Sequence, residues 1–194
     1  MKNIIEFLKT RRSTVAKRMA IGRVKKSDLK TILEIGTRVP DHGALKPWKI
    51  KVIQGKTRKY LDGIILREFK KINPSASEKI LNIEGIRFQR AHTILGVVSS
   101  PIFHKKIPEW EQSLSAAAVC CNLLYAAQGL KYASQWLTEW YAYNKTLLEA
   151  LDINPNKEKV AGFIYIGKIL LPPKERNRPE ISEIITNVSS GNII

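Results

Sequence analysis

The sequence lacks the features that mark several classes of protein. It has only two cysteines, Cys120 and Cys121, and three scattered histidines. Neighbouring cysteines rarely form a disulfide because the bridge would be strained. No repeated Cys/His spacing of the kind that holds zinc is present. We therefore expect buried, inert thiols and no metal site.

Long apolar runs are also missing. No segment reaches the roughly 18 apolar residues of a membrane-spanning helix. The amphipathic N-terminal segment is interrupted at Glu6 and is too short for a signal peptide. We expect a cytoplasmic protein with no membrane partner. GxSxG, Walker and GxGxxG motifs are absent, and no acid–base constellation can be recognised, so we predict no catalytic side chain.

Acidic residues are scarce. The chain holds 33 Lys+Arg against 17 Asp+Glu, and its formal net charge is +16. Residues 1–60 alone carry 17 basic and 4 acidic side chains. This imbalance fits an anionic partner such as nucleic acid, an acidic surface or a phosphorylated small molecule. It fits equally a genome whose composition favours lysine, so that many solvent-exposed positions are lysine without a function. No helix-turn-helix, RRM or zinc module is recognisable.

The remaining composition is that of a globular chain. Its 194 residues, 44% of them hydrophobic, suffice for one domain over residues 1–194. Apolar periodicity predicts strands over 49–53, 92–99, 133–138 and 160–167. It predicts helices over 2–10, 27–36, 57–71, 77–90, 108–131 and 144–151. A last apolar patch comprises Ile181, Ile184, Ile185 and Val188.

The predicted helix over 108–131 is the longest. Its middle, residues 116–127, is apolar on nearly every side. A helix of this kind is buried all round, either inside a domain or between two subunits. Chains of this size rarely enclose a helix completely, so a dimer interface is a natural explanation.

Two polar stretches could bind a ligand. Arg38 and His42 lie four residues apart in a turn-rich segment, where Gly43 is free to adopt a positive φ. Together they could face one anionic or aromatic ligand. Arg11, Arg12 and Ser13 suit a phosphate, because guanidinium groups and a hydroxyl are good phosphate donors. Alternatively, the two arginines only neutralise the last carbonyls of a helix.

The order of these stretches along the chain adds information. Arg11-Arg12-Ser13 is followed by Arg38-Val39-Pro40-Asp41-His42-Gly43, by Pro108-Glu109-Trp110-Glu111-Gln112, by Gln135-Trp136-Leu137-Thr138, by Gly162-Phe163-Ile164-Tyr165-Ile166-Gly167 and by Arg176-Asn177-Arg178-Pro179. The series resembles the nitroreductase family of FMN-dependent oxidoreductases, especially its short bacterial branch. The resemblance extends over residues 3–188.

This resemblance implies a structure and a set of cofactor contacts. The fold would be α+β, with a mixed central sheet flanked by helices, in an intertwined homodimer with FMN at the interface. The FMN-binding residues would be Arg11, Arg12 and Ser13 at the phosphate and ribityl chain, Arg176 and Arg178 near the phosphate, Arg38 and His42 from the partner subunit, and Trp136, Leu137 and Thr138 against the isoalloxazine. Residues 124–129 match a segment assigned to the nicotinamide cofactor.

The resemblance also implies an activity. The protein would be an enzyme that uses NAD(P)H to reduce nitroaromatics, quinones or similar planar acceptors, by ping-pong hydride transfer through FMN. Flavin would supply the redox chemistry, and the protein would position it. The alternatives are a flavin-binding module without turnover and a basic nucleic-acid-binding protein. Two residues depart from the family pattern: Val15 replaces a basic residue, and Glu139 replaces a glycine.

Overall fold

The computed structural model describes residues 3–20 and 22–187, so Val188 of the predicted apolar patch lies outside the described residues. The helices are α1 (Ile4–Thr10), α2 (Lys26–Gly36), α3 (Lys56–Ile72), α4 (Glu78–Glu84), α5 (Glu109–Gly129), α6 (Lys145–Ala150) and α7 (Ile181–Ile184). The strands are β1 (Met19–Ala20), β2 (Trp48–Ile53), β3 (Thr93–Ser99), β4 (Ala133–Leu137) and β5 (Lys159–Ile169). Short 3₁₀ turns include His42–Ala44 and Phe88–Arg90. The predicted helix over 77–90 is divided, because its regular part ends at Glu84.

Strand β5 is the centre of the sheet. The order is β1-β5-β3-β2, with β4 also paired to β5. All pairings among the described strands are antiparallel, whereas we expected a mixed sheet. The β2–β3 pair shows the reason. Ile53 at the end of β2 pairs with Ile94 near the start of β3, so the chain through α3 and α4 returns to the end of the sheet that it left.

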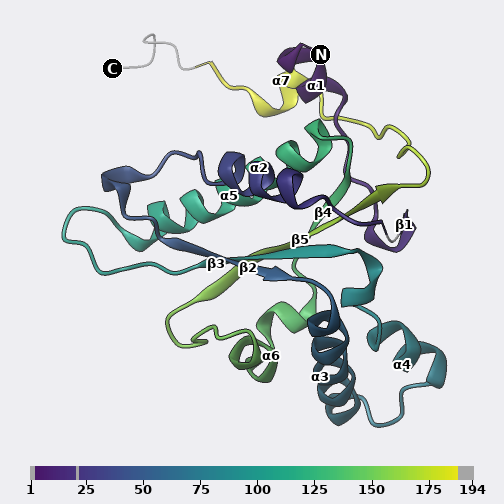
Figure 1. The fold of residues 1–194 in the computed structure, drawn as a ribbon. Helices are drawn as coiled ribbons and strands as arrows, with labels where there is room; N and C mark the ends of the chain where they lie inside the picture. Colours follow the sequence, from purple (N-terminus) through teal and green to yellow (C-terminus); the bar gives the residue numbers. More distant parts are fainter. Residues whose placement is uncertain (1–2, 21, 188–194) are drawn as a thin grey trace.

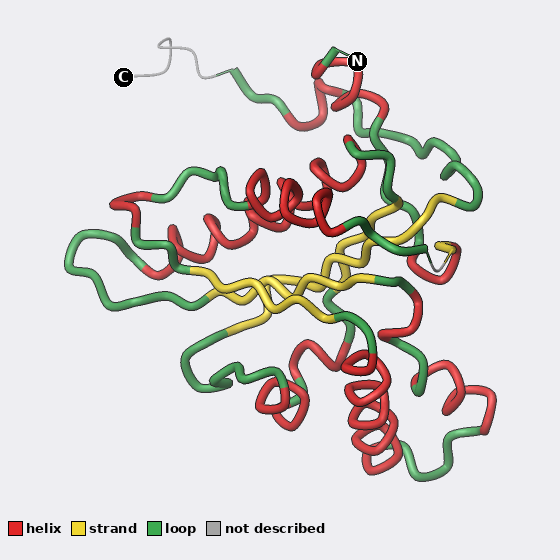
Figure 2. The backbone as a smooth tube through the Cα atoms, viewed as in Figure 1, coloured by secondary structure: helices red, strands yellow, loops and turns green. Residues whose placement is uncertain are grey.

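Helices cover both faces of this sheet. In Figure 1, α2 and α5 lie on one side of the strands, and α3 and α6 lie on the other. Figure 2 shows the strands as a narrow layer between the two helical layers. All seven residues of β3 are buried, as expected for a strand that is covered on both faces. The α+β class is therefore confirmed.

Side chains of β3 and β5 alternate between two cores. The core beneath α2 and α5 includes Ile32, Leu95, Val97, Leu123, Ile164 and Ile166. The core beside α3 and α6 includes Leu61, Phe88, Ile94, Tyr141, Phe163 and Tyr165. The aromatic rings of this second core touch one another: Phe88 packs edge to face on Phe163, with ring centroids 5.3 Å apart. This period of two is the pattern of a strand between two layers.

The exposed apolar residues of helix α5 lie in its first two turns. Trp110 is 71% exposed and Leu114 is 49% exposed, whereas Leu123 is fully buried against the sheet and α2. Residues 116–127, the apolar middle of the helix, are all buried or half-buried within a single copy, and a dimer interface along α5 stays a prediction. Burial raises the pKa of the Cys120 thiol to about 12, which confirms an inert thiol there, while Cys121 is half-buried.

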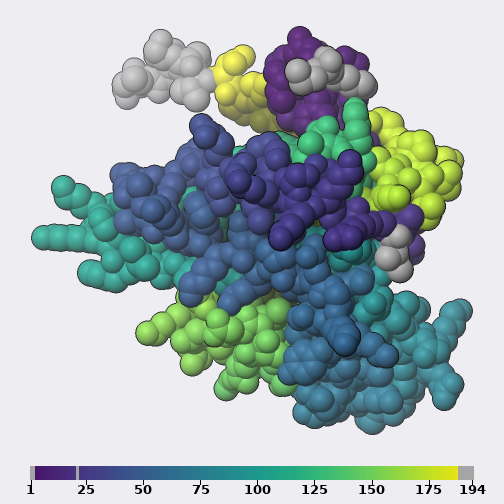
Figure 3. All heavy atoms as spheres, viewed as in Figure 1, coloured from purple at the N-terminus to yellow at the C-terminus, as the bar shows by residue number. Residues whose placement is uncertain are grey.

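Helices α1 and α7 both appear at the same end of the molecule in the view of Figure 1. In Figure 3, the purple N-terminal atoms lie beside yellow atoms that follow β5. We call the extended segment 170–180 the C-terminal arm. Within residues 3–20 and 22–187, no helix has the length and apolar character needed to cross a membrane.

Candidate active site

Five of the predicted site residues meet at one hollow. A cavity of about 210 Å³ is lined by Arg11, Arg12, Ser13, Arg176 and Arg178. Arg11 to Ser13 follow α1 directly, whereas the other two arginines lie on the C-terminal arm. We call this hollow the arginine cradle. The structure thus brings together both of the segments that we predicted to bind phosphate.

The end of α5 fixes one side of the cradle. Nε of Arg11 donates to Oε1 of Gln128 at 3.2 Å, and Nη2 donates to Oγ of Ser13 at 3.2 Å. The guanidinium of Arg11 also lies over the ring of Tyr125, 5.7 Å from its centroid, a cation–π arrangement. Arg11 is therefore held in position before any ligand arrives.

A carboxylate that sequence reasoning missed lies in the cradle. One oxygen of Glu175 accepts hydrogen bonds from Nη1 of Arg12 at 3.0 Å, Nη2 of Arg178 at 3.0 Å and the backbone N–H of Arg176 at 2.9 Å. The Arg176 N–H, followed by the Arg12 side chain, lowers the pKa of Glu175 to about 2. Three donors thus converge on one anionic oxygen, as they would on a phosphate.

A second group of predicted residues lies in the loop between α2 and β2. Gly43, Ala44 and Lys46 all have positive φ, at 69°, 50° and 51°, which confirms the prediction for Gly43. The carboxylate of Asp41 holds this turn by accepting from the N–H groups of Leu45 and Lys46, at 3.2 and 2.8 Å. Left-handed alanine and lysine are sterically costly, and such backbone strain clusters at functional sites.

The same loop contacts the first turn of α5. Nδ1 of His42 lies 2.8 Å from Oε2 of Glu111, and Nδ2 of Asn122 donates to the carbonyl of Arg38 at 2.8 Å. Both predicted side chains, Arg38 and His42, belong to exposed residues. The loop therefore presents them outward from the α2/α5 side of the molecule.

The arginine cradle and His42 lie at opposite ends of α5. Glu111, beside His42, is in the first turn of α5, and Gln128, beside Arg11, is in the last. An α-helix rises about 1.5 Å per residue, so these two positions are about 25 Å apart along the axis. One chain does not bring its own Arg11 and His42 to one ligand.

The third predicted group extends from the end of β4. Trp136 and Leu137 belong to the strand, and Thr138 is an exposed residue directly after it. Nε1 of Trp136 donates to the carbonyl of Ala161 at 3.0 Å, and the indole covers Gly162, where a Cβ would lie 1.9 Å from Nε1. The Trp136 side chain is thus engaged with the sheet and Leu137 packs against the core beside α3 and α6, which leaves Thr138 as the exposed residue of this group.

Strand β4 connects this third group to the cradle. The backbone N–H of Thr14, next to the cradle residue Ser13, donates to the carbonyl of Ser134 at 3.0 Å. Oγ of Ser134 in turn accepts from Nε2 of Gln128 at 2.9 Å. The cradle, the end of α5 and the start of β4 are therefore one hydrogen-bonded unit.

Glu139, which departs from the family pattern, belongs to a network of ion pairs just after Thr138. Its carboxylate accepts from both Nη atoms of Arg90, from Nη1 of Arg87 at 2.9 Å and from the hydroxyl of Tyr141 at 2.5 Å. Burial raises the pKa of Glu139, but hydrogen bonds from Arg90 and Tyr141 outweigh burial, and the net shift is downward. Arg87 is also paired with Glu84, which we count in this Glu139 network. The network anchors the segment that follows the predicted flavin-contacting residues.

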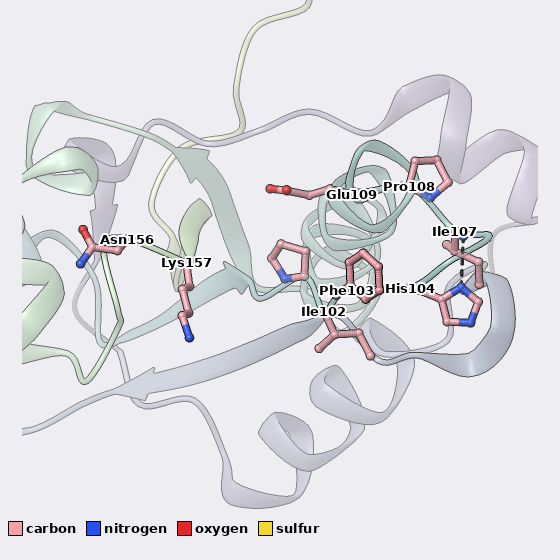
Figure 4. A pocket seen from close by; sticks show the side chains of 9 residues that line it. Ile102, Phe103, His104, Ile107, Pro108, Glu109, Asn156 and Lys157 are labelled. Atoms are coloured by element: carbon pink, nitrogen blue, oxygen red, sulfur yellow. Dashed lines mark hydrogen bonds between the residues drawn. The ribbon is translucent and has the colours of Figure 1, made fainter.

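A separate hollow of about 510 Å³ lies between the β3–α5 loop and the turn before β5, lined by Pro101, Ile102, Phe103, His104, Ile107, Pro108, Glu109, Asn156 and Lys157. Figure 4 shows these side chains spread around an open space. Nδ1 of His104 accepts from the N–H of Ile107 at 3.1 Å, so this histidine shapes its own loop. We did not predict this hollow, and Phe103, which is 97% exposed, carries no motif that could have indicated it.

Known proteins share both the sequence pattern and the fold. The sequence pattern of the Nitroreductase family matches residues 8–168. The chain belongs to the nitroreductase family. The Escherichia coli (strain K12) protein named "Putative NAD(P)H nitroreductase YdjA" is 29% identical over 163 residues, which cover 84% of this chain and 86% of that protein.

Two solved structures show the same fold at lower identity. The nitroreductase-like family protein from Bacillus cereus superposes with a TM-score of 0.80 at 22% identity, covering 97% of each chain. A nitroreductase with bound FMN from Bacteroides fragilis gives a TM-score of 0.70 at 20% identity, covering 97% of this chain and 100% of that one. The predicted family and its fold are therefore confirmed, and with them the class of oxidoreductase enzymes. The roles of individual site residues stay predictions.

Proposed function

We propose that this protein is an FMN-dependent oxidoreductase that takes electrons from NAD(P)H. Family membership and the NAD(P)H in the name of the Escherichia coli relative support the donor. The FMN bound in the Bacteroides fragilis nitroreductase supports the cofactor. Residues 1–194 would form a single domain carrying this activity.

One observation from the structure carries the proposal. Three donors from Arg12, Arg178 and the Arg176 backbone, all of which line the arginine cradle, converge on one oxygen of Glu175. That carboxylate oxygen stands in for a phosphate oxygen, and the donor set suits the phosphate of FMN. Arg11 and Ser13 line the same hollow and add further donors.

We also propose that a homodimer completes the site. In each copy the cradle and His42 lie at opposite ends of α5. The cradle and His42 can contact one FMN only if the two contributions come from different copies. The exposed apolar side of α5, which carries Trp110 and Leu114, is suited to be buried between them.

When bound, FMN would supply the redox chemistry, by accepting a hydride from NAD(P)H and reducing a nitroaromatic, quinone or similar planar acceptor in a ping-pong cycle. The chain's own residues bind and orient. The arginine cradle holds the phosphate, Leu137 and Thr138 flank the ring system, and Arg38 and His42 approach from the second copy. We assign no side chain as an acid or a base.

The visible spectrum of the purified protein tests this function. Protein incubated with FMN and then desalted should be yellow, and it should bleach when NADPH or NADH is added without oxygen. Protein that remains colourless would overturn the proposal. Stable FMN without turnover by nitroaromatic or quinone acceptors would favour the flavin-binding module instead.

A further inference from the structure

A second basic hollow lies beside the start of α2, and the proposed function leaves it without a role. It has a volume of about 500 Å³ and is lined by Arg23, Lys25, Lys26, Tyr132 and Lys168. We call it the lysine hollow. Its four cations belong to exposed residues. Among the residues that the structure describes, their side chains form no ion pair.

The neighbouring acid does not neutralise this hollow. Asp28 already accepts from the hydroxyl of Tyr132 at 2.7 Å and from Oγ of Ser27 at 3.2 Å, and it does not line the cavity. Even with Asp28 counted, four positive charges face one negative charge. Like charges around a low-dielectric hollow repel one another and concentrate the field on an incoming anion.

A histidine behind the hollow is subject to the same field. Nδ1 of His92 lies 3.4 Å from the backbone N of Val24, between two residues that line the hollow. Burial lowers the pKa of His92, and the nearby charges of Arg58 and Arg23 lower it further. The side chain of His92 therefore adds no positive charge of its own to the back of the hollow, and its Nδ1 accepts from the N–H of Val24.

A third hollow connects the lysine hollow to the arginine cradle. This intermediate hollow, of about 320 Å³, shares Arg11 and Arg12 with the cradle and Tyr132 with the lysine hollow. Between these shared residues its wall is largely apolar, with Phe7, Ile169, Pro172 and Pro173. An apolar space between two basic sites suits the base or sugar of a nucleotide, whose phosphates reach the basic ends.

The two basic hollows differ in one respect. In the arginine cradle, the side chains of Arg12 and Arg178 are already paired with the carboxylate of Glu175. No carboxylate lines the lysine hollow within the described part of the chain. A polyvalent anion would therefore meet four uncommitted cations there, without displacing an internal partner.

We propose that the lysine hollow is a second phosphate-binding site, which takes a phosphate group of a small nucleotide other than FMN. This proposal rests on the proposed function, because it assumes that FMN occupies the cradle. The phosphate can come from the electron donor, since NADPH carries a 2′-phosphate that NADH lacks. It can also come from a separate nucleotide that binds without reacting. In both cases the recognised group is a phosphate monoester.

Calorimetric titration of the FMN-saturated protein with inorganic pyrophosphate tests the site. The test variant is Lys25→Gln/Lys26→Gln, and the matched control is Lys59→Gln/Lys79→Gln, which removes the same charge from exposed positions of α3 and α4. We expect the dissociation constant to rise about tenfold in the test variant, because two exposed and therefore water-screened contacts are lost, and to change little in the control. No saturable binding to the wild type, or equal loss in both variants, would overturn the proposal.

Steady-state kinetics then distinguish the sources of the phosphate. If the site serves the donor, Lys25→Gln/Lys26→Gln raises KM for NADPH about tenfold and leaves KM for NADH unchanged. If it serves a separate nucleotide, both KM values stay constant while pyrophosphate binding is lost. A gel-shift assay at physiological salt provides the last check. If the wild type binds a DNA or RNA duplex and the test variant does not, the small-molecule assignment is overturned.

The proposal of a phosphate site in the lysine hollow can be tested separately from the proposed FMN-dependent function. If the protein takes up no FMN, pyrophosphate is titrated into Arg11→Ala/Arg12→Ala, in which the cradle is disabled. Binding that persists in this variant and is lost on adding Lys25→Gln/Lys26→Gln supports the lysine hollow without any flavin. Absence of binding there overturns the lysine hollow alone.

Discussion

The Glu139 network and the arginine cradle use the same side chain in opposite ways. In the network, Arg87 and Arg90 are each paired with carboxylates of Glu84 or Glu139 and are largely buried. In the cradle, Arg12 and Arg178 share the single, exposed carboxylate of Glu175. Where there is one carboxylate for each guanidinium, the arginines stabilise the fold. Where guanidiniums outnumber carboxylates, the arginines remain available to bind a ligand.

This contrast has an energetic basis. Removing one member of a buried ion pair leaves the other charge desolvated, which typically costs about 3–5 kcal/mol of folding stability. An exposed pair contributes about 0–1 kcal/mol, because water screens it. Substitutions in the network should therefore reduce folding stability, and substitutions in the cradle should reduce ligand binding.

The largest effect is expected in the network. Arg90→Leu removes one of the two arginine partners of Glu139, and also the donor to the hydroxyls of Tyr141 and Tyr165. We expect the free energy of unfolding to fall by about 3–5 kcal/mol, measured by urea denaturation at neutral pH. The control is Arg67→Leu, whose pair with Glu68 is longer, at 3.8 Å. If both variants unfolded at the same urea concentration, the network would contribute no more to folding stability than an exposed ion pair does.

In the cradle, Arg12→Ala should act on the cofactor alone. It removes one charge-assisted contact to the phosphate, worth about 1.5–3 kcal/mol. The dissociation constant of FMN, measured by fluorescence, should rise about 10- to 100-fold, while the unfolding midpoint of the flavin-free protein stays constant. Arg18→Ala, at an exposed position outside the cradle, should bind FMN as the wild type does. Loss of stability equal to the loss of affinity would mark Arg12 as structural.

A smaller effect is expected for the loop that approaches from the second copy. Arg38→Ala or His42→Ala should weaken FMN binding by about 1–2 kcal/mol, with less effect on stability. Mixing Arg12→Ala with Arg38→Ala subunits gives hybrid dimers in which one site has both native contributions. Recovery of tight FMN binding in about a quarter of the sites supports the shared site. No recovery after subunit exchange would place both residues at a site within one chain.

The smallest effect is expected for Glu175, and its sign is opposite. Glu175→Gln removes the internal anion, so FMN should bind about threefold more tightly. The pKa of Glu175 is about 2, so the carboxylate is charged and competes with phosphate throughout the physiological range. Glu180→Gln, on the same arm, is the control. Weaker binding of FMN to Glu175→Gln would show that the carboxylate instead positions Arg12 and Arg178.

The sequence predicted the structure best at strands that are buried on both faces and at turns that require a glycine. The apolar run of β3 and the positive φ of Gly43 follow from local physics, and the structure has both. The meeting of Arg11 with Arg176 is different, because nothing in either segment indicates the other. That expectation came from the family resemblance.

Residues that act through distant partners could not be predicted. Glu139 is satisfied by Arg90, which lies 49 residues earlier in the chain, and a lone glutamate beside Trp140 has no local signature of such a pair. In the sequence, Glu175 is only one more charged residue in a basic segment. Its role becomes visible when the fold brings Arg12 next to it. The lysine hollow likewise arises only when Lys168, at the far end of β5, lies beside the start of α2.

The arginine cradle is built from two segments that are synthesised at different times. Arg11 to Ser13 precede every strand of the described sheet, whereas Arg176 and Arg178 follow β5, with which β1, β3 and β4 pair. Domains fold as their segments emerge, so the sheet can be complete while half of the cradle is still missing. We therefore expect cofactor capture to follow sheet formation, and a chain that stops directly after β5 to fold without retaining flavin.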